Sequence, residues 1–218
     1  MKPRRQFIKT TLRFLAGAGV MFSPLIKAVR VVYAAAQKII LPKDTDRRTL
    51  IDRNPANLDT RNLQTTSLKD FGVMGLSDYE VDLNAWRLEV TGSVKKPLEL
   101  TYSQVVSLPS IERNVLLICP GVFANHGRWK GISVAKLLEE SNLEEGVTYI
   151  AFSGPPGNYT KEESFPVAEI RSDQVFLAYA VNGEALPRQH GFPLRLVAED
   201  HYGAEWVKYV YKIEALKS

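Results

Sequence analysis

Apolar and polar positions alternate along much of the chain in a way that predicts short strands with brief helices between them. Residues 85–92 alternate strictly, which is typical of a strand with one buried face, and the continuous apolar run 175–181 predicts a strand buried on both faces. Over 133–142, apolar residues recur at helical spacing after a serine that can cap the first turn. Further strands are expected over 97–100, 115–118, 149–152, 194–198 and 206–213. A further helix is expected over 101–108, capped at Thr101 or Ser103. This pattern predicts an α+β fold that is rich in strands.

The only cysteine, Cys119, directly follows the predicted strand 115–118 and precedes Pro120-Gly121. Proline lacks an N–H and glycine relaxes the backbone, so the strand is expected to end here, with the thiol where the strand opens into a loop. Chemistry is commonly placed on loops that rigid strands support, although free cysteines are also often plain core residues. From the local pattern alone, both roles for Cys119 stay open.

The N-terminal segment resembles an export signal. Arg4-Arg5 is followed by an apolar pair and a lysine, as in the twin-arginine motif, a weakly apolar stretch covers 12–22, and the alanines 34–36 offer a cleavage site. We therefore expect residues 1–36 to direct the protein to the periplasm. The alternative is a basic amphipathic helix that lies on a membrane surface. A stable membrane span is not expected, because basic residues interrupt the apolar run well before the roughly 20 residues that a span requires.

Charge is unevenly distributed along the 218 residues. Seven of the 28 basic residues precede residue 37, whereas all 24 acidic residues follow it, so the chain beyond the signal is slightly acidic despite an overall net charge of +4. A nucleic-acid partner thus loses its electrostatic support. The single cysteine excludes an internal disulfide, and the sequence carries neither a C-x-x-C-H haem motif nor the cysteine set of an iron–sulfur cluster.

Composition divides the rest of the chain into two parts. In residues 37–77, Pro, Gly, Asp, Asn and Thr interrupt every apolar run, which predicts an extended N-terminal arm without a long helix or strand. Residues 78–218 hold the strong elements and are expected to form one domain. The sequence shows no internal repeat and no low-complexity segment.

Three separated segments carry a family resemblance. They are the stretch around Cys119, the block 182–197 with the sequence NGEALPRQHGFPLRLV, and the segment 202–209 with the sequence YGAEWVKY. The pattern NG-x-x-LP-x-x-HG-x-P-x-R followed by YG-x-x-x-VK resembles the molybdopterin-binding domain of the sulfite oxidase family, and the likeness covers roughly residues 55–216. The spacing from Cys119 to Trp129 is similar to that of the bacterial branch that includes the periplasmic methionine sulfoxide reductase catalytic subunit.

The resemblance implies a mixed-sheet fold of the sulfite oxidase type that binds a molybdenum–molybdopterin cofactor. Cys119 would be the sole protein ligand of the metal, because a thiolate is a soft anionic donor and the pterin dithiolene supplies two further sulfurs. The family places His190, Arg195 and Lys208 at the pterin phosphate, where cations and planar donors suit a dianion. Its further contacts come from backbone groups at Trp206 and Val207 and from the polar side chains Asn62 and Ser153.

The residues after Cys119 depart from the animal and plant members of the family, which carry a glycine-asparagine-arginine pattern there. The chain instead has PGVFANH over 120–126, and an arginine-rich sulfite pocket is not evident. His126 is a candidate proton donor or acceptor beside the metal, because an imidazole titrates near neutral pH. Tyr202 is a second candidate proton donor. A hydrogen-bonded loop histidine and a packed aromatic ring are the respective alternatives.

The predicted function is an exported molybdenum oxidoreductase that transfers an oxygen atom to or from a small substrate. Electrons would pass to or from a separate carrier, either a membrane haem protein or a soluble cytochrome, because the chain has no haem or iron–sulfur motif of its own. Two other classes stay open. One is a non-catalytic β-rich binding module, and the other is a hydrolase with Cys119 as nucleophile, a histidine base and Asp200 as the orienting acid. A zinc site made by Cys119 with His126, His190 and His201 is a further alternative.

Overall fold

Two five-stranded sheets form the framework of the fold in the residues that the computed structural model describes, 38–157 and 160–217. The described residues from Ile40 onward belong to one compact unit, Ile40–Ser218. The predicted export signal, residues 1–36, lies outside the described residues. Among the helices of the described residues, none is both long and apolar enough to span a bilayer.

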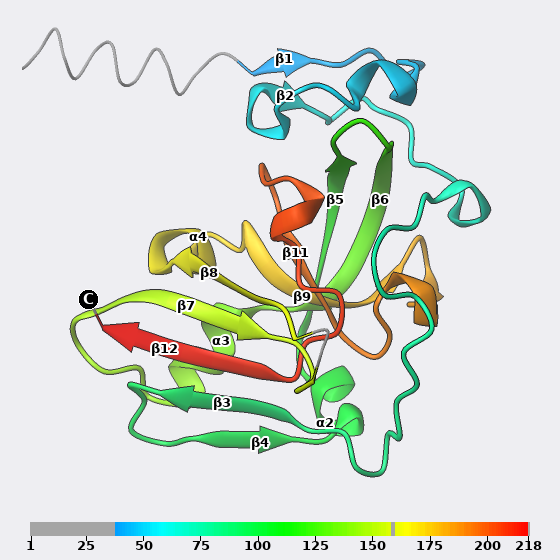
Figure 1. Cartoon of the computed structure of the whole chain (residues 1–218). Helices are drawn as coiled ribbons and strands as arrows, with labels where there is room; N and C mark the ends of the chain where they lie inside the picture. The colour runs from blue at the N-terminus through cyan, green and yellow to red at the C-terminus, as the bar shows by residue number, and fades with distance from the viewer. Residues whose placement is uncertain (1–37, 158–159, 218) are drawn as a thin grey trace, which may run out of the picture. The chain divides into compact units, whose positions relative to one another are not determined.

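The first sheet is antiparallel and is built around a long hairpin. Its order is β10 (Glu184–Ala185), β9 (Val175–Val181), β6 (Phe123–Ile132) and β5 (Ser110–Cys119), and β11 (Arg195–Ala198) also pairs with β9. Strands β5 and β6 are ten residues each and pair from Ser110 opposite Ile132 to Cys119 opposite Phe123 (Figure 1). Gly121 in the connecting turn has a φ of +71°, a left-handed conformation that glycine adopts without steric cost.

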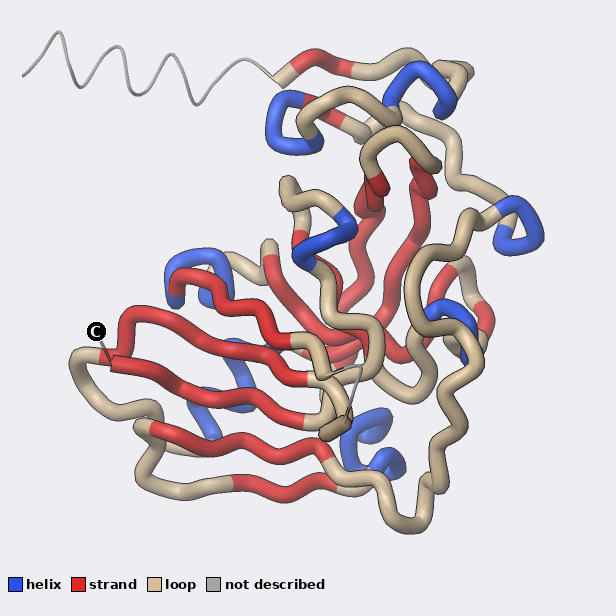
Figure 2. The backbone as a smooth tube through the Cα atoms, viewed as in Figure 1, coloured by secondary structure: helices blue, strands red, loops and turns tan. Residues whose placement is uncertain are grey.

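The second sheet is mixed. Its order is β4 (Leu98–Leu100), β3 (Leu88–Gly92), β12 (Lys212–Lys217), β7 (Val147–Ser153) and β8 (Glu162–Pro166), with β3 and β12 parallel and the other pairs antiparallel. The short α-helices of the described residues are α2 (Tyr102–Ser107), α3 (Val134–Glu140) and α4 (Val167–Arg171) (Figure 2). The prediction of a strand-rich α+β fold with a mixed sheet is confirmed.

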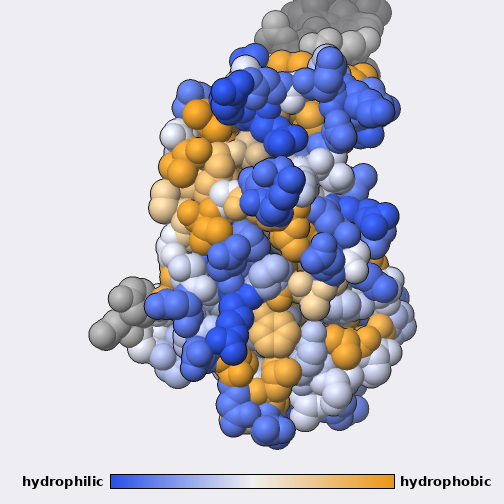
Figure 3. Space-filling view, turned by 90° about the vertical axis from the view of Figure 1, so that its right-hand side faces the viewer, coloured by the Kyte–Doolittle hydropathy of each residue, from blue (hydrophilic) through white to orange (hydrophobic). Residues whose placement is uncertain are grey.

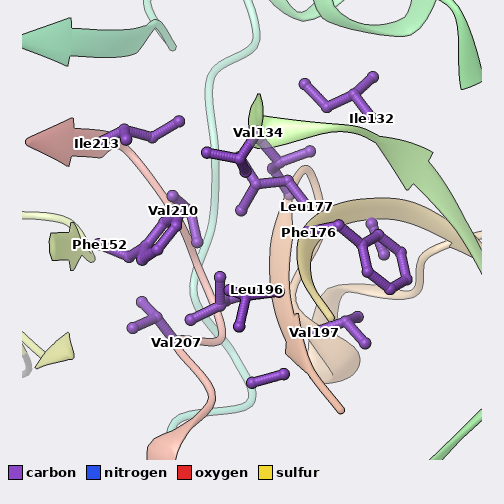
Figure 4. Close-up of a cluster of buried hydrophobic side chains, with 14 of the residues drawn as sticks. Ile132, Val134, Phe152, Phe176, Leu177, Leu196, Val197, Val207, Val210 and Ile213 are labelled. Carbon is purple, nitrogen blue, oxygen red and sulfur yellow. The ribbon is translucent and has the colours of Figure 1, made fainter. Parts of the chain in front are cut away.

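The main apolar core is contributed by both sheets. Figure 4 shows part of it, where Phe152 and Ile213 of the second sheet and Leu177 and Leu196 of the first lie with the segment that carries Val210. Each of these five side chains is fully buried, and burial of one such side chain stabilises a fold by about 1.5–3 kcal/mol. This core holds the ends of β5, β9 and β11 in fixed positions relative to the loop that precedes β12.

The arm packs a second, smaller cluster against the β5–β6 hairpin. Four arm leucines and three hairpin residues form it: Leu41, Leu50, Leu58, Leu63, Leu116, Ile118 and Ala124. Among residues 38–77, the regular elements are β1 (Ile39–Ile40), β2 (Leu58–Asp59) and the 3₁₀ turns η1 (Arg47–Leu50), η2 (Pro55–Asn57) and η3 (Leu68–Asp70). The described part of the arm therefore has no long helix or strand, but the four leucines of the second cluster are buried. The predicted domain boundary at residue 77 stays a prediction.

Local predictions agree with the structure where capping or strict alternation dictated the element. Ser133 caps α3 by accepting from the Lys136 N–H, and Thr101 forms a capping box with Gln104 at the start of α2. The strand expected over 206–213 is wrong over 206–211, because β12 begins at Lys212 and residues 206–209 line a cavity instead. Strand β6 was not predicted, since its glycines and charged residues break the apolar alternation.

Gly131 lies where β6 pairs with β9, and a substitution there tests how closely the two strands approach. A Cβ at this position would lie 1.8 Å from the Leu177 carbonyl oxygen, which is backbone and cannot move aside. Gly131→Ala is expected to lower the free energy of unfolding by about 3 kcal/mol, measured by urea denaturation. Gly146→Ala is the control, because its φ of +82° is strained but no atom lies within 4 Å, so it should cost only about 1–2 kcal/mol. Equal losses of unfolding free energy in the two variants would contradict the close approach of β6 and β9 at Gly131.

Candidate functional site

A cavity of about 350 Å³ opens at the C-terminal end of β5. Its walls come from stretches that lie far apart in the sequence: 72–76, 117–123, 154–155, 160–161, 189–195 and 203–209. The structure brings six of the predicted site residues to this one cavity: Cys119, His190, Arg195, Trp206, Val207 and Lys208. These residues meet because β5, β11 and the loop before β12 are anchored in the same core.

Cys119 lies at the end of β5 and lines the cavity together with Leu117, two residues earlier on the same face of the strand. The thiol is partly exposed, and burial raises its pKa. A thiol of this kind stays protonated at neutral pH, so the site does not provide the activated thiolate that a cysteine hydrolase needs. A soft metal ion, in contrast, displaces the thiol proton when it binds.

Arg195 is a buried cation at the base of β11, with 5% of its surface exposed. Its guanidinium carbon lies 5.7 Å from the centre of the Trp129 ring and 5.4 Å from that of Trp206, so both indoles stabilise the charge by cation–π contact. One terminal N–H donates to the His190 carbonyl at 2.9 Å. Burial lowers the pKa of Arg195 to about 10, which leaves the group charged at neutral pH.

His190 and Lys208 share the cavity with Arg195 and respond to its charge. Burial, with the charges of Arg195 and Lys208, lowers the pKa of His190 to about 4, so the imidazole is neutral at pH 7. Burial, with the charge of Arg195, also lowers the pKa of Lys208 to about 8. No aspartate or glutamate is found among the described residues that line the cavity. Arg195 and Lys208 share the lining with a third cation, Lys161, whose ammonium lies 3.3 Å from Glu163 outside the lining. A cavity lined by cations and no carboxylate favours an anionic ligand.

A segment of the arm, Gly72–Leu76, forms one wall of the cavity. The Lys208 ammonium donates to the carbonyls of Met74 at 2.7 Å and of Leu76 at 2.6 Å. Sequence reasoning missed this wall because residues 72–76 have no apolar periodicity. The only available signal was the pair Gly72 and Gly75, which pointed to an irregular backbone without indicating what it approaches.

The residues of the cavity fit the cofactor that the sequence implies. The indole Nε1 of Trp206 and the Nε of Arg195 are buried and have no hydrogen-bond partner among the described residues. Buried donors without acceptors are costly, so these two groups are suited to receive the oxygen or nitrogen acceptors of a polar ligand. Together with the soft sulfur of Cys119, the set matches a ligand that has both a sulfur-bound metal and an anionic tail.

Four other predicted residues lie outside the cavity lining. His126 is paired with Leu116, and strand alternation therefore places its side chain on the opposite face of the hairpin from Cys119, fully buried. Tyr202 packs against the second apolar cluster, and Asn62 is exposed. Ser153 precedes the cavity residue Gly154, and its hydroxyl donates to Glu162 at 3.0 Å.

The zinc alternative is not supported by the arrangement of its ligands. Within the described residues, no three His, Cys, Asp or Glu side chains gather in a way that could hold a metal ion. His201 is instead placed between two carboxylates, with Nδ1 2.9 Å from Glu205 and Nε2 2.9 Å from Glu169. Asp200, the orienting acid of the hydrolase alternative, is not part of the cavity lining.

Comparison with known proteins identifies the family. Residues 75–218 match the family described as the oxidoreductase molybdopterin binding domain. The protein-methionine-sulfoxide reductase catalytic subunit MsrP of Gluconobacter oxydans (strain 621H) is 31% identical over 146 residues, which cover 60% of this chain and 47% of that protein. The NADH nitrate reductase of Petunia hybrida is 30% identical over 158 residues, which cover 59% of this chain and 17% of that protein. The sulfane dehydrogenase SoxCD from Paracoccus pantotrophus has a TM-score of 0.60 and 25% identity, covering 64% of this chain and 40% of that chain.

The chain belongs to the oxidoreductase molybdopterin binding domain family. This membership confirms the predicted cofactor, the predicted class of enzyme and the predicted fold. The chain spans about half the length of MsrP and less than a fifth of the nitrate reductase, so the activities named for those proteins belong to longer chains.

The depressed pKa of His190 predicts how stability depends on pH. The folded imidazole stays neutral down to a pH near 4, whereas an unfolded one takes up a proton near pH 6.5, so the unfolded state binds more protons between these values. The free energy of unfolding should therefore fall as the pH drops through this range. We expect the cofactor-free chain to lose on the order of 1–2 kcal/mol more than its His190→Gln variant between pH 7 and pH 5, measured by urea unfolding. Equal losses in the two proteins would contradict a depressed pKa.

Proposed function

We propose that the chain is an exported oxidoreductase that uses a molybdenum–molybdopterin cofactor to transfer an oxygen atom to or from a small substrate. The observation that carries the proposal is the cavity itself, in which the only cysteine faces a buried arginine and a half-buried lysine with no carboxylate in the described lining. A thiol and cations that line the same cavity suit a ligand with a soft metal and a phosphate.

Cys119 would hold the metal through its thiolate, and the rigid end of β5 would fix the direction of that bond. When bound, the cofactor supplies a metal that changes oxidation state and exchanges an oxygen atom. The side chain of Leu117 next to Cys119, and that of Phe123 opposite it, make this end of the cavity apolar. An apolar wall excludes water from the thiolate and strengthens nearby electrostatic interactions.

Arg195 and Lys208 would bind the cofactor's phosphate. The guanidinium offers a planar fork, and its Nε has no partner among the described residues. The Lys208 ammonium has three N–H groups, of which two go to the Met74 and Leu76 carbonyls, so the third is available to an anion. His190 is neutral at pH 7 and therefore donates or accepts a hydrogen bond without adding charge.

The proton-transfer roles of His126 and Tyr202 stay predictions, and their positions give them no support. The His126 side chain lies on the face of the hairpin that packs against the second apolar cluster, and burial lowers its pKa. The proposed contacts of Asn62 and Ser153 with the cofactor also stay predictions, since neither lines the cavity. Proton transfer to the substrate would then involve water or the cofactor's own surroundings in the cavity.

The chain is proposed to act in the periplasm with a separate electron carrier, a membrane haem protein or a soluble cytochrome. The support is the twin-arginine pattern at Arg4-Arg5 and the lack of haem or iron–sulfur motifs in the sequence. The relatives are named for different substrates: methionine sulfoxide in proteins, nitrate and sulfane sulfur. The proposal is therefore limited to a small group that can gain or lose one oxygen atom.

Replacing Cys119 tests the proposed metal ligand. A serine hydroxyl is a harder and weaker donor than a thiolate, so Cys119→Ser is expected to change the visible absorption of the purified holoenzyme and lower its turnover by roughly a hundredfold or more. Molybdenum per chain is measured by elemental analysis, with turnover measured against a panel of sulfoxides, sulfite and nitrate. Val122→Ala is the control, because this side chain is half exposed in the adjacent turn and does not line the cavity. A wild-type chain that folds without molybdenum in a host that makes molybdopterin would overturn the proposed function.

The export proposal has its own test. Changing both Arg4 and Arg5 to lysine keeps the charge of the segment but removes the paired guanidinium groups that define the motif. We expect the variant to remain in the cytoplasm of a host with the twin-arginine route, measured by cell fractionation and immunoblotting. Lys2→Arg is the control for a change of basic residue outside the motif. Equal export of the double variant and the wild type would contradict this route.

A further inference from the structure

The wall segment Gly72–Leu76, here called the strap, connects the cavity to the arm. It precedes β3 and lies among the loop residues of Figure 2. Val73 and Met74 of the strap line the cavity and are also partly exposed, at 37% and 52%. On the side of the molecule that Figure 3 shows, apolar side chains form separate patches among polar ones. The strap thus contributes to both the cavity wall and the molecular surface, and its residues are not part of the apolar core.

Asn125 holds the first residue of the strap. Its Oδ1 accepts from the Gly72 N–H at 3.1 Å, and its Nδ2 donates to the Gly72 carbonyl, also at 3.1 Å. The side chain is only 1% exposed, so both hydrogen bonds are shielded from water. Two bonds to one peptide residue fix its orientation as well as its position. A buried amide that lost one of these partners would carry an unsatisfied polar group.

Gly72 is closely fitted to its surroundings. A Cβ at this position would lie 2.3 Å from Cδ1 and 2.8 Å from Cβ of Phe123, the residue opposite Cys119 in the hairpin. A side chain on residue 72 would therefore displace either the strap or the ring. Two residues of the β5–β6 hairpin, Phe123 and Asn125, therefore fix the position of Gly72.

The other end of the strap holds Lys208. The Met74 and Leu76 carbonyls each accept from its ammonium, and the Leu76 carbonyl also accepts from the Tyr209 hydroxyl at 3.2 Å. These are contacts between residues more than 130 positions apart. The lysine side chain has four rotatable carbons, so its ammonium is placed by the groups that it contacts. The strap carbonyls supply those groups.

We propose that Asn125 is a positioning residue which, through the strap, fixes the Lys208 ammonium at the phosphate of the molybdopterin and thereby slows release of the cofactor. The inference rests on the proposed function for the identity of the ligand. Asn125 does not line the cavity and has no contact with Lys208, so it acts only through residues 72–76. Asn125 lies in the stretch around Cys119, and the sequence alone assigned it no role.

The test compares holoenzymes that differ at Asn125. Asn125→Asp keeps the acceptor for the Gly72 N–H but replaces the donor to the Gly72 carbonyl by an oxygen that repels it. We expect this variant to lose molybdopterin roughly tenfold faster than the wild type, the ratio that the loss of about one buried hydrogen bond produces. Molybdopterin that remains after timed gel filtration is measured by the fluorescence of its oxidised form. Amide hydrogen exchange of residues 72–76 should accelerate in the same variant.

Asn182 provides a matched control. Its Oδ1 accepts from the N–H of Arg128 in β6 at 2.9 Å, and its Nδ2 donates to the Thr66 carbonyl at 2.8 Å, so one end of this amide also holds an arm residue. Neither Asn182 nor Thr66 lines the cavity. Asn182→Asp should weaken the arm to a similar extent without changing the release of molybdopterin.

A double variant separates positioning from general destabilisation. If Asn125 acts through Lys208, then Asn125→Asp combined with Lys208→Met should lose cofactor no faster than Lys208→Met alone, because the contact being positioned is already absent. Gly72→Ala displaces the strap from Phe123 and should therefore release molybdopterin as fast as Asn125→Asp does. It replaces Asn125→Asp in the test if the Asn125→Asp protein does not fold. Equal release from wild type, Asn125→Asp and Gly72→Ala would overturn the inference, as would additive effects in the double variant. A wild-type chain without molybdopterin would instead overturn the proposed function on which the inference rests.

Discussion

The register of the β5–β6 hairpin is the constraint on which the site depends. Because side chains alternate between faces, the pairing of Cys119 with Phe123 sends these two residues to the cavity and sends Ile118 and Ala124 to the second apolar cluster. A slip of one residue would exchange the two faces, burying the thiol against the arm and moving Leu116 and Ile118 to the cavity. The leucines of the arm oppose such a slip, since they are buried only when the present face meets them. The packing of the arm therefore fixes the direction of the cysteine.

Arg195 and Lys208, two cations of the cavity lining, are stabilised by groups other than carboxylates. Arg195 has the faces of two tryptophans and the His190 carbonyl, and Lys208 has the carbonyls of Met74 and Leu76. Aromatic faces and carbonyl dipoles offset part of the cost of burial but leave the net positive charge in place. A carboxylate would have neutralised the site. Burial lowers the pKa values of Arg195, Lys208 and His190, and the charge of Arg195 lowers those of Lys208 and His190 further.

The sequence predicted those features that local chemistry determines. The serine and threonine caps of α3 and α2 and the alternating residues of β3 were found because each is set by a few neighbouring residues. The cavity residues Cys119, His190, Arg195 and Lys208 were found through family spacing, because no periodicity in the chain links residues so far apart. Strand β6 was missed because its glycines and charged residues break the apolar alternation, and Gly131 is required by the close approach of the β9 backbone. The strap and the face of His126 depend on tertiary contacts and on strand pairing, which a single sequence does not show.

The distribution of the lining along the chain has a consequence for biosynthesis. The cavity combines backbone of residues 72–76 with residues as late as Tyr209, and the Lys208 ammonium meets a carbonyl 134 positions earlier. During synthesis the emerging chain cannot complete this enclosure until its last strand has left the ribosome, since contacts of such high sequence separation form late. A nascent chain that ends before residue 209 therefore lacks part of the cavity lining. Loading of the cofactor would therefore follow the synthesis of residue 209, the last residue of the lining.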